Sequence, residues 1–428
     1  MKETTRRNFI KSTGAAAIGG TIALNIGLPR SSFAMNSDTL KVGLIGCGGR
    51  GTGAANQALS ADPNVVLTHM ADIFQDRLDL SINSLKKLHG DKVKADKDTM
   101  FVGFDGAKQV IESDVDVVIL TTPPYFRPKQ LEMAVEAGKH IFCEKPMAVD
   151  GPGIKRVLAA AKKAKEKNLS LVSGFCWRYH TPKRETFSRV LDGAIGNVNS
   201  VYNTYNTGGL WLRDTEPDWS PMRKKMRNWL YYNYISGDHI VEQAIHSIDM
   251  MSWALGDVQP VKATGTGGRQ SRTGEEYGNI FDHFAIVYEY ENGVKGYHFS
   301  RQQKDCSGSY GVEMMGDKGR CEVNCGRNRH TIFGTEEWKY KGKGNDMYQQ
   351  EHDELFASIR SGNPMNDGEW MAQSTMLGIM GRMVAYTGQT ITYEDALNSQ
   401  EKLGPDEITD TTEFTDPPVA QPGITKFL

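Results

Sequence analysis

After its N-terminal segment, the sequence lacks any hydrophobic run long enough to cross a membrane. A spanning helix needs about 20 consecutive apolar residues, and no stretch beyond residue 34 approaches that length. The chain also lacks an excess of charge, because 50 Lys and Arg face 52 Asp and Glu, for a formal net charge of −2. This balance gives no basic stripe for nucleic acid and no polybasic patch for a lipid surface. We therefore expect neither partner.

Cysteine is scarce and is not arranged in metal-binding pairs. The six cysteines are Cys47, Cys143, Cys176, Cys306, Cys321 and Cys325. The first three lie in or beside predicted buried strands, where cysteine behaves as a small hydrophobic residue. Cys321 and Cys325 are spaced too widely for a CxxC motif, and no second pair completes a zinc site. The sequence predicts neither a disulfide nor a metal site.

The first 34 residues have the pattern of an export signal. Paired arginines in Thr-Arg-Arg-Asn-Phe-Ile-Lys, residues 5–11, precede a weakly apolar run over 12–28, and residues 32–34 offer small side chains before a cut. An ordinary secretory signal or an unstructured tail is the alternative. We predict a twin-arginine signal peptide over 1–34, export of the folded protein, and a periplasmic or otherwise exported mature chain.

The remaining part of the chain, about 390 residues, is long enough for two domains. From residue 40, short β-rich runs alternate with helical patterns, which is typical of a parallel sheet covered by helices. The predicted strands are 40–45, 65–71, 115–121, 140–143 and 169–173, and the predicted helices are 52–60, 75–88, 128–137 and 153–167. This predicts an α/β Rossmann domain that binds a dinucleotide, over residues 39–174.

A glycine-rich turn follows the first predicted strand, with the sequence Gly46-Cys47-Gly48-Gly49-Arg50-Gly51. In a GxGxxG turn the first glycine permits a tight bend, the second lets backbone amides approach a pyrophosphate, and the third lets the helix lie close to the strand. The helix N-terminus adds partial positive charge. Because the chain has 45 glycines, this spacing alone is a weak signal, and its position between strand and helix strengthens it.

An acidic residue, Asp72, ends the second predicted strand at the distance expected for a ribose ligand. A carboxylate there accepts hydrogen bonds from the adenosine ribose, although capping of the next helix would also explain it. The carboxylate favours NAD by repelling a 2′-phosphate, and nearby Arg77 tempers this preference. We predict NAD as the cofactor, with NADP as the alternative.

Two further motifs follow predicted strands, at the edge where open α/β sheets bind ligands. They are Thr121-Thr122-Pro123-Pro124 and Glu144-Lys145-Pro146. A lysine beside a nicotinamide can donate a hydrogen bond to a substrate hydroxyl or carbonyl oxygen. The alternative for Lys145 is a surface lysine before a turn proline.

Residues 238–249, DHIVEQAIHSID, predict one continuous amphipathic helix. Asp238 suits the N-cap and His239 the rim of the helix. Glu242, His246 and Asp249 fall at i, i+4 and i+7, on one stripe. The residues expected to face the core are Ile240, Val241, Ile245 and Ile248. A solvated face also explains the stripe, whereas a metal lyase built on His239, Glu242 and His246 is disfavoured because the spacing is not HExxH.

Together these motifs resemble the Gfo/Idh/MocA family of nicotinamide-dependent oxidoreductases, over nearly all of the mature sequence. The resemblance implies that Lys145 and His246 meet at the nicotinamide and that a cis peptide precedes Pro146. Two positions depart from the common pattern: Glu242 replaces an aspartate, and Arg127 replaces a histidine and offers a permanent cation to a cofactor phosphate or an acidic sugar. The predicted cofactor contacts are Gly46, Gly48, Gly49, Arg50, Gly51, Asp72, Thr122, Pro123, Arg127, Glu144 and Lys145.

The βα alternation ends after residue 174, which predicts a second, α+β domain over 175–428. Its predicted strands are 197–206, 259–269, 280–291, 294–303, 309–316 and 319–325, with a hairpin turn at Asn292-Gly293. Predicted helices follow at 348–361 and 368–387. The family resemblance implies an open, mostly antiparallel sheet whose uncovered face often makes subunit contacts, so we expect a homo-oligomer, a dimer or tetramer.

Aromatic and charged side chains are interleaved over residues 208–234, a composition that suits a carbohydrate or a loop fixed by its aromatic residues. They are Trp211, Arg213, Trp219, Arg227, Trp229, Tyr231, Tyr232 and Tyr234. Further polar candidates are Arg178, Asp282, His283 and Arg301. The predicted substrate contacts are Lys145, Arg178, Trp229, Glu242, His246, Asp249 and Asp282.

These residues predict oxidation of a secondary hydroxyl of a sugar, cyclitol or related carbohydrate. His246 is the expected general base, Glu242 orients it, and Lys145 polarises the same oxygen. Because dinucleotides are scarce outside the cytoplasm, an exported enzyme must hold its cofactor tightly. The alternatives are a redox-neutral, NAD-dependent glycosidase that works through a transient keto sugar, and a non-catalytic protein that binds a dinucleotide or sugar.

Overall fold

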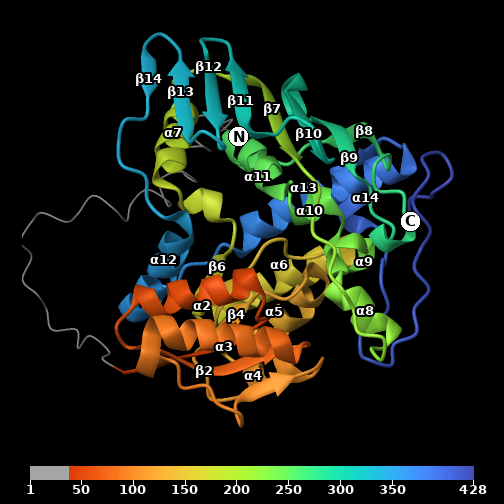
Figure 1. Ribbon diagram of the computed structural model, residues 1–428. Helices are drawn as coiled ribbons and strands as arrows, with labels where there is room; N and C mark the ends of the chain where they lie inside the picture. Colours follow the sequence, from red (N-terminus) through yellow and green to blue (C-terminus); the bar gives the residue numbers. More distant parts are fainter. Residues whose placement is uncertain (1–37) are drawn as a thin grey trace, which may run out of the picture. The chain divides into compact units, whose positions relative to one another are not determined.

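A computed structural model describes residues 38–428 (Figure 1). The predicted signal peptide, residues 1–34, lies outside these described residues. Between residues 38 and 428, no helix combines the length and hydrophobicity needed to span a lipid bilayer.

The first sheet is parallel and has six strands in the order β3-β2-β1-β4-β5-β6. The strands are β1 Leu40–Ile45, β2 Val65–Asp72, β3 Met100–Val102, β4 Val117–Leu120, β5 His140–Cys143 and β6 Leu171–Ser173. The central strands are short apolar runs, such as Val-Val-Ile-Leu in β4, in which every residue is buried. Burial on both faces requires such continuous runs. The chain order reverses between β1 and β4, and this switch point is where open α/β sheets bind ligands.

Helices connect the parallel strands. They are α2 Gly49–Ala61, α3 Gln75–His89, α4 Gly106–Glu112, α5 Arg127–Glu136 and α6 Gly151–Glu166. The predicted Rossmann fold is confirmed. Strand β3 and helix α4 were not predicted, because they have only three and seven residues, too few to show a clear periodicity.

The second sheet has nine strands in the order β14-β13-β12-β11-β7-β10-β9-β8-β15. The strands are β7 Val198–Thr207, β8 Lys262–Gly268, β9 His283–Glu289, β10 Lys295–Gln302, β11 Ser309–Gly316, β12 Arg320–Asn324, β13 Arg329–Phe333, β14 Glu337–Lys339 and β15 Ile391–Thr392. Every neighbouring pair is antiparallel except β7 with β10. The predicted open, mostly antiparallel sheet is confirmed, and its last three strands in sequence are additions to the prediction.

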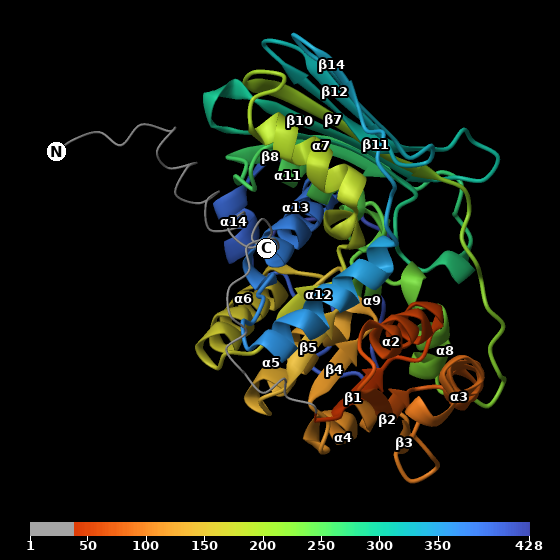
Figure 2. The same ribbon diagram turned by 90° about the vertical axis from the view of Figure 1, so that its left-hand side faces the viewer.

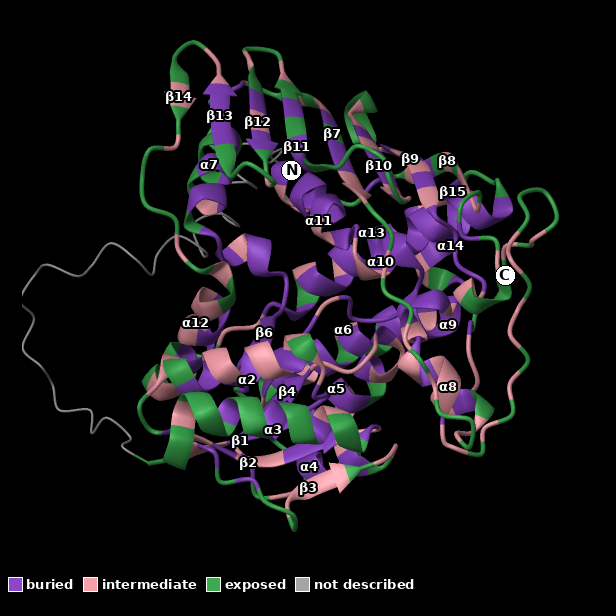
Figure 3. Ribbon diagram, in the orientation of Figure 1, coloured by how far each residue is buried: buried purple, intermediate pink, exposed green. Residues whose placement is uncertain are grey.

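Helices cover one face of this sheet, as Figure 2 shows for α7 Thr181–Leu191, α11 Ile245–Ala254 and α13 Gly368–Thr387. The strands alternate buried and more exposed residues, seen as alternating colours on β11 and β12 in Figure 3. Such alternation is typical of a sheet with one face on the core. The second face therefore carries half-exposed side chains.

Helix α12, Met347–Ser361, returns from the second sheet to the first. Its Gln349 donates a hydrogen bond to the Gln57 carbonyl of α2 at 3.0 Å, and its Arg360 pairs with Asp62 at 2.7 Å. The two sheets are thus joined by a helix that packs beside the glycine-rich turn.

Candidate active site

The glycine-rich turn connects β1 to α2 with the geometry of a phosphate-binding loop. Gly46 has a φ of +95°, and a side chain at Gly51 would place its Cβ 1.8 Å from the Gly46 carbonyl oxygen. By contrast, the space beside Gly48 and Gly49 is open, with no atom within 4 Å of an added Cβ. Helix α2 begins there without a side-chain cap, so its first amides can bind an anion. The loop fits a pyrophosphate.

Asp72 lies at the carboxyl end of β2 and supports this turn directly. Its carboxylate accepts hydrogen bonds from the backbone amides of Cys47 at 2.7 Å and Phe74 at 2.9 Å. Burial raises the pKa of Asp72, against these two amide contacts. The carboxylate therefore fixes both the glycine-rich turn and the approach to α3, at the place where a ribose is expected.

Arg50 holds two motifs together at the start of α2. Its guanidinium donates to Glu144 at 2.5 Å and to Glu351 of α12 at 2.6 Å, and it lies 4.8 Å from the centre of the Tyr348 ring. Burial raises the pKa of Glu351 well above its usual range, more than Arg50 lowers it. Glu351 was not a predicted site residue, because 301 positions separate it from Arg50 and no local pattern marks it.

The motifs after β4 and β5 are linked through buried polar contacts. Thr122, beside Pro123, donates to the Gln130 side chain at 2.6 Å. Arg127 is buried and donates to the Pro146 carbonyl at 2.6 Å. Burial lowers the pKa of Arg127. Arg127 thus supports the turn that contains the cis Lys145–Pro146 peptide, which confirms the expected isomer, while cofactor contact by Arg127 stays a prediction.

The predicted continuous helix over 238–249 is wrong. The chain forms α10, His239–Glu242, and α11, Ile245–Ala254, with a break at Gln243 and Ala244. Glu242, His246 and Asp249 therefore do not share one helical stripe. The break leaves the Glu242 carbonyl free of the helix, because terminal carbonyls have no intrahelical partner. No glycine or proline in the sequence signals this break.

Lys145 contacts Glu242 at this break between the helices. Its Nζ donates to the free Glu242 carbonyl at 2.6 Å and lies 3.5 Å from the Glu242 carboxylate. These contacts do not show Glu242 orienting His246, as predicted, because the backbone carbonyl and the carboxylate of Glu242 both contact Lys145. These contacts fix the Lys145 side chain at the carboxyl edge of β5.

His246, at the start of α11, is half-buried beside this lysine. Its ring centre lies 5.0 Å from that of Trp177 and 6.2 Å from that of Phe175. Burial, helped by the nearby cations Lys145 and Lys183, lowers the pKa of His246 well below its usual value. Among the described residues, Nδ1 of His246 has no hydrogen-bond partner. At neutral pH the imidazole is neutral, which is the form that accepts a proton.

Asp249 and Arg178 were both predicted to contact substrate. In the structure they form an ion pair with each other. The guanidinium of Arg178 donates to Asp249 at 2.7 Å and to Asp257 at 2.6 Å, and Ser374 donates to Asp249 at 2.7 Å. Arg178 also lies 4.3 Å from the Trp370 ring centre. These contacts leave neither charge free for a substrate.

Asp282 is also occupied by contacts within the protein. It is fully buried, and its carboxylate accepts from the amides of Gln270 and Ser271 at 2.8 and 2.6 Å and contacts the His283 ring at 2.8 Å. Burial raises the pKa of Asp282, but these hydrogen bonds together hold it below its usual range. Arg301 donates to the carbonyl of Ser307 at 2.7 Å. Both residues fasten loops of the second domain.

At the N-terminal end of segment 238–249, Asp238 and His239 contact other parts of the protein and stabilise the fold. Asp238 caps α10, as predicted, and accepts from the amide of Phe281 at 2.7 Å and the hydroxyl of Tyr386 at 2.6 Å. The prediction that His239 lies at the rim is wrong, because it is buried with Nε2 3.0 Å from the Ser300 hydroxyl. Within residues 38–428 no group of three His, Cys, Asp or Glu side chains is placed to hold a metal.

Trp177, which the sequence analysis did not single out, lies beside His246, and two tyrosines pack on Trp177. Trp177 follows β6, and its ring centre is 6.3 Å from that of Tyr205 and 6.4 Å from that of Tyr310. The Nζ of Lys183, which is buried, lies 5.1 Å from the Trp177 ring centre. The position of Trp177 just after a parallel strand was a usable signal, whereas Tyr205 and Tyr310 come from the distant sheet. Trp229 lies elsewhere, packed in a separate hydrophobic cluster with Phe74.

Comparison with known families supports this architecture. Residues 40–171 match the Gfo/Idh/MocA oxidoreductase family, NAD-binding Rossmann fold, and residues 188–376 match the C-terminal alpha/beta domain of the same family. Among solved structures, a levoglucosan dehydrogenase in complex with NADH and levoglucosan is similar, with a TM-score of 0.65 and 20% identity over 83% of this chain and 100% of that chain. At this identity the likeness shows the fold.

Two curated relatives illustrate the range of similarity. The chain is 29% identical to the dTDP-3,4-didehydro-2,6-dideoxy-alpha-D-glucose 3-reductase of Actinomadura kijaniata over 39% of this chain and 45% of that protein. It is 24% identical to the Myo-inositol 2-dehydrogenase of Thermotoga maritima over 84% of this chain and 100% of that protein. The first match spans less than half of the relative, and the second spans all of it. With both domains matched in order, the chain belongs to the Gfo/Idh/MocA family of oxidoreductases.

Proposed function

We propose that the protein is an NAD(P)-dependent oxidoreductase that acts on a secondary hydroxyl of a sugar, cyclitol or related carbohydrate. The observation that carries the proposal is the placement of a neutral histidine, His246, near a half-buried lysine, Lys145, whose Nζ is held by Glu242 at the carboxyl edge of a Rossmann sheet. When bound, the nicotinamide supplies a hydride acceptor or donor. The open space above Gly48 and Gly49 and the uncapped start of α2 fit its pyrophosphate.

The side chains divide the proton chemistry between them. His246 takes the hydroxyl proton, because its lowered pKa keeps the imidazole unprotonated at neutral pH. Lys145 donates a hydrogen bond to the same oxygen, and the backbone and side chain of Glu242 hold its ammonium in place. The Trp177 ring, against His246, excludes water from one side of the base.

The substrate class rests on the relatives and on the aromatic surroundings. Relatives with this fold include a Myo-inositol 2-dehydrogenase and a levoglucosan dehydrogenase. Trp177 lies against His246, and Tyr205 and Tyr310 pack beside Trp177. Ring faces pack against the C–H groups of a sugar, while the tyrosine hydroxyls offer hydrogen bonds.

The test is a panel of sugars, cyclitols and glycosides with the purified protein, followed by the absorbance of reduced nicotinamide. We expect reduction of NAD by at least one alcohol and none with His246→Ala. Cleavage of a glycoside without net reduction would replace this proposal with the redox-neutral glycosidase. Binding of a dinucleotide with no turnover on any member of the panel would favour a non-catalytic protein.

We also propose export through the twin-arginine pathway, supported by the pair Arg6-Arg7 before an apolar run. Cell fractionation should find the mature protein in the periplasm, and replacement of both arginines by lysine should retain the precursor inside the cell. Export of the double-lysine variant at the normal rate would contradict this assignment.

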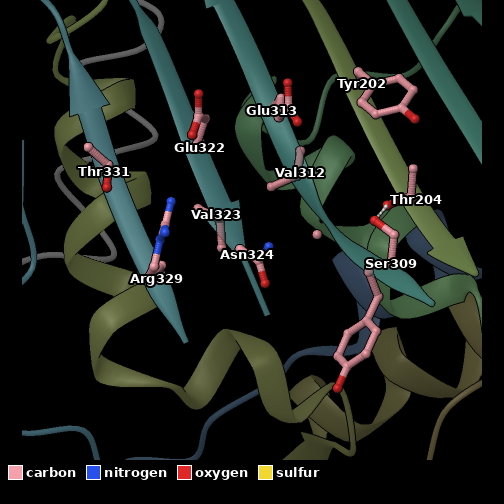
Figure 4. A pocket seen from close by; sticks show the side chains of 12 residues that line it. Tyr202, Thr204, Ser309, Val312, Glu313, Glu322, Val323, Asn324, Arg329 and Thr331 are labelled. Carbon is pink, nitrogen blue, oxygen red and sulfur yellow. Dashed lines mark hydrogen bonds between the residues drawn. The ribbon is translucent and has the colours of Figure 1, made fainter. Parts of the chain in front are cut away.

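The uncovered face of the nine-stranded sheet supports a homo-oligomer. Tyr202 and Phe299 are 40% and 38% exposed there, their ring centres are 5.6 Å apart, and a shallow hollow beside them is bordered by Glu313, Glu322 and Arg329 (Figure 4). Apolar rings rimmed by charge are typical of interfaces. Light scattering should show a dimer or tetramer, and Tyr202→Glu should shift the mass toward the monomer.

A further inference from the structure

A segment of the second domain, residues 208–228, reaches the first domain beside the expected ribose site. We call it the strap. It leaves the end of β7, passes through α8, Pro221–Arg227, and is followed by a short turn at Trp229–Tyr231. Figure 2 shows α8 beside α3, far from the nine-stranded sheet where the strap begins. The strap therefore spans from one domain to the other.

The strap contacts the residues that follow Asp72. The ring centre of Trp219 lies 5.0 Å from that of Phe74, and the guanidinium of Arg227 lies 5.0 Å from the Phe74 ring and 5.6 Å from the Trp219 ring. Phe74 is the residue whose amide donates to Asp72 at 2.9 Å. The strap thus packs on a side chain only two positions from the carboxylate expected to bind ribose.

An ion pair fastens the strap to α3. Arg227 donates to both oxygens of Asp76, at 3.1 and 2.8 Å. A two-pronged arginine–carboxylate pair fixes orientation as well as distance. The Arg227 side chain is only 17% exposed and that of Asp76 is 46% exposed, so the pair lies at the rim of the contact, where it can open.

The C-terminal tail holds the strap from its other side. Arg223 of α8 pairs with Asp410 at 2.6 Å, and Lys225 pairs with Asp416 at 2.7 Å. The same tail accepts a hydrogen bond from Tyr125, which follows β4, at the Pro405 carbonyl, 2.7 Å away. Strap and tail are therefore attached to the loops after β2 and after β4, the two strands that flank β1.

One hydrophobic cluster joins all three parts. Its buried members include Phe74 from the first domain, Met222 and Met226 from the strap, and Leu403 and Ile408 from the tail. The adenosine half of a dinucleotide binds at the carboxyl ends of β1, β2 and β4. This cluster borders that region from the side of the second domain.

We propose that the strap forms the outer wall of the adenosine half of the dinucleotide site and that bound cofactor leaves only when the strap lifts from Phe74 and Asp76. The inference rests on the proposed function, because it requires that NAD(P) binds at the glycine-rich turn. Because the Arg227–Asp76 ion pair holds the strap in place, the strap slows dissociation of the cofactor without contacting the reacting atoms.

The test is the dissociation rate of radiolabelled NAD, chased with unlabelled NAD, in the full chain. Asp76→Asn and Arg227→Leu each remove the rim ion pair, and we expect release to quicken by about three- to fivefold, the size of effect that a partly exposed ion pair has. The exchanged pair, Asp76→Arg with Arg227→Asp, should restore slow release. Unchanged release in both single variants would overturn the proposal.

A control is Lys41→Met, which breaks an ion pair with Asp114 at the amino end of β1, the sheet edge opposite the glycine-rich turn. We expect it to release NAD at the rate of the unmodified protein, and equally fast release from this control and the strap variants would also overturn the proposal. If the unmodified protein binds no dinucleotide, the proposed function fails instead. Turnover at saturating NAD should be unaffected in Asp76→Asn, which separates retention from chemistry.

Discussion

Within segment 238–249, the charged side chains at the two ends are buried and have several hydrogen-bond donors, whereas the one in the middle has few contacts. At the ends, Asp238 and Asp249 are buried, and each has several donors, including Tyr386 for the first and Arg178 for the second. In the middle, the side chain of Glu242 has one contact, at 3.5 Å to Lys145. Buried polar groups are normally satisfied, so the many donors of Asp238 and Asp249 indicate structural roles, whereas Nδ1 of His246, without a partner among the described residues, is available to a ligand. Sequence spacing alone does not distinguish the two.

The sharpest test of this contrast is His246→Ala. Loss of a general base lowers turnover by about 10²–10⁴-fold, and we expect kcat to fall in that range while NAD still binds. Steady-state kinetics and a binding titration measure the two effects. Turnover within about threefold of the unmodified enzyme would remove His246 from the mechanism, since a general base contributes far more than that.

The opposite end should affect stability rather than catalysis. Asp249→Ala takes from Arg178 one of its two carboxylates and leaves a buried charge poorly paired. Such losses cost about 3–5 kcal/mol, which we expect to see as a lower midpoint in denaturant unfolding. Glu242→Ala is the comparison, with a smaller loss of stability and a larger loss of turnover. The reverse order would show that the two positions have exchanged roles.

Lys145→Met tests the hydrogen bond to substrate. A hydrogen bond from a charged donor contributes about 1.5–3 kcal/mol, so kcat/KM should fall by about 10–100-fold. The loss should appear mostly in kcat if the bond strengthens as the oxygen gains charge. An increase in KM alone would limit Lys145 to binding the ground state.

The smallest expected effect is on the pH profile. Because burial and nearby cations lower the pKa of His246, the acid limb of kcat/KM should lie below about pH 6.5, the value of a free histidine. Activity is lost as the pH falls through the pKa of the folded protein, because protonated imidazole cannot accept a proton. Lys183→Met removes a cation and should move the acid limb to higher pH. A limb that moves to lower pH would show that another group titrates.

Much of the first domain followed from local pattern. Apolar runs such as 117–120 predict strands, and the glycine-rich turn predicts its own bend, because a side chain at Gly51 would collide with the Gly46 carbonyl. Asp72, Lys145 and His246 were also singled out from motifs and family resemblance, and their roles toward cofactor and substrate stay predictions. The continuous helix over 238–249 failed because a periodicity of 3.6 residues persists in the sequence across the break at Gln243 and Ala244.

By itself, the sequence determined the parallel sheet of the first part of the chain, the mostly antiparallel sheet of the second, and the glycine-rich turn, because each depends on steric or periodic features of neighbouring positions. Only the tertiary structure decided which distant residues are partners. Glu242 accepts a hydrogen bond from Lys145, and Arg178 forms an ion pair with Asp249. Likewise, Glu351 pairs with Arg50, and Trp219 of the strap packs on Phe74. These contacts join residues far apart in the chain. Their burial and pairing depend on how the two sheets pack, and no local pattern encodes that.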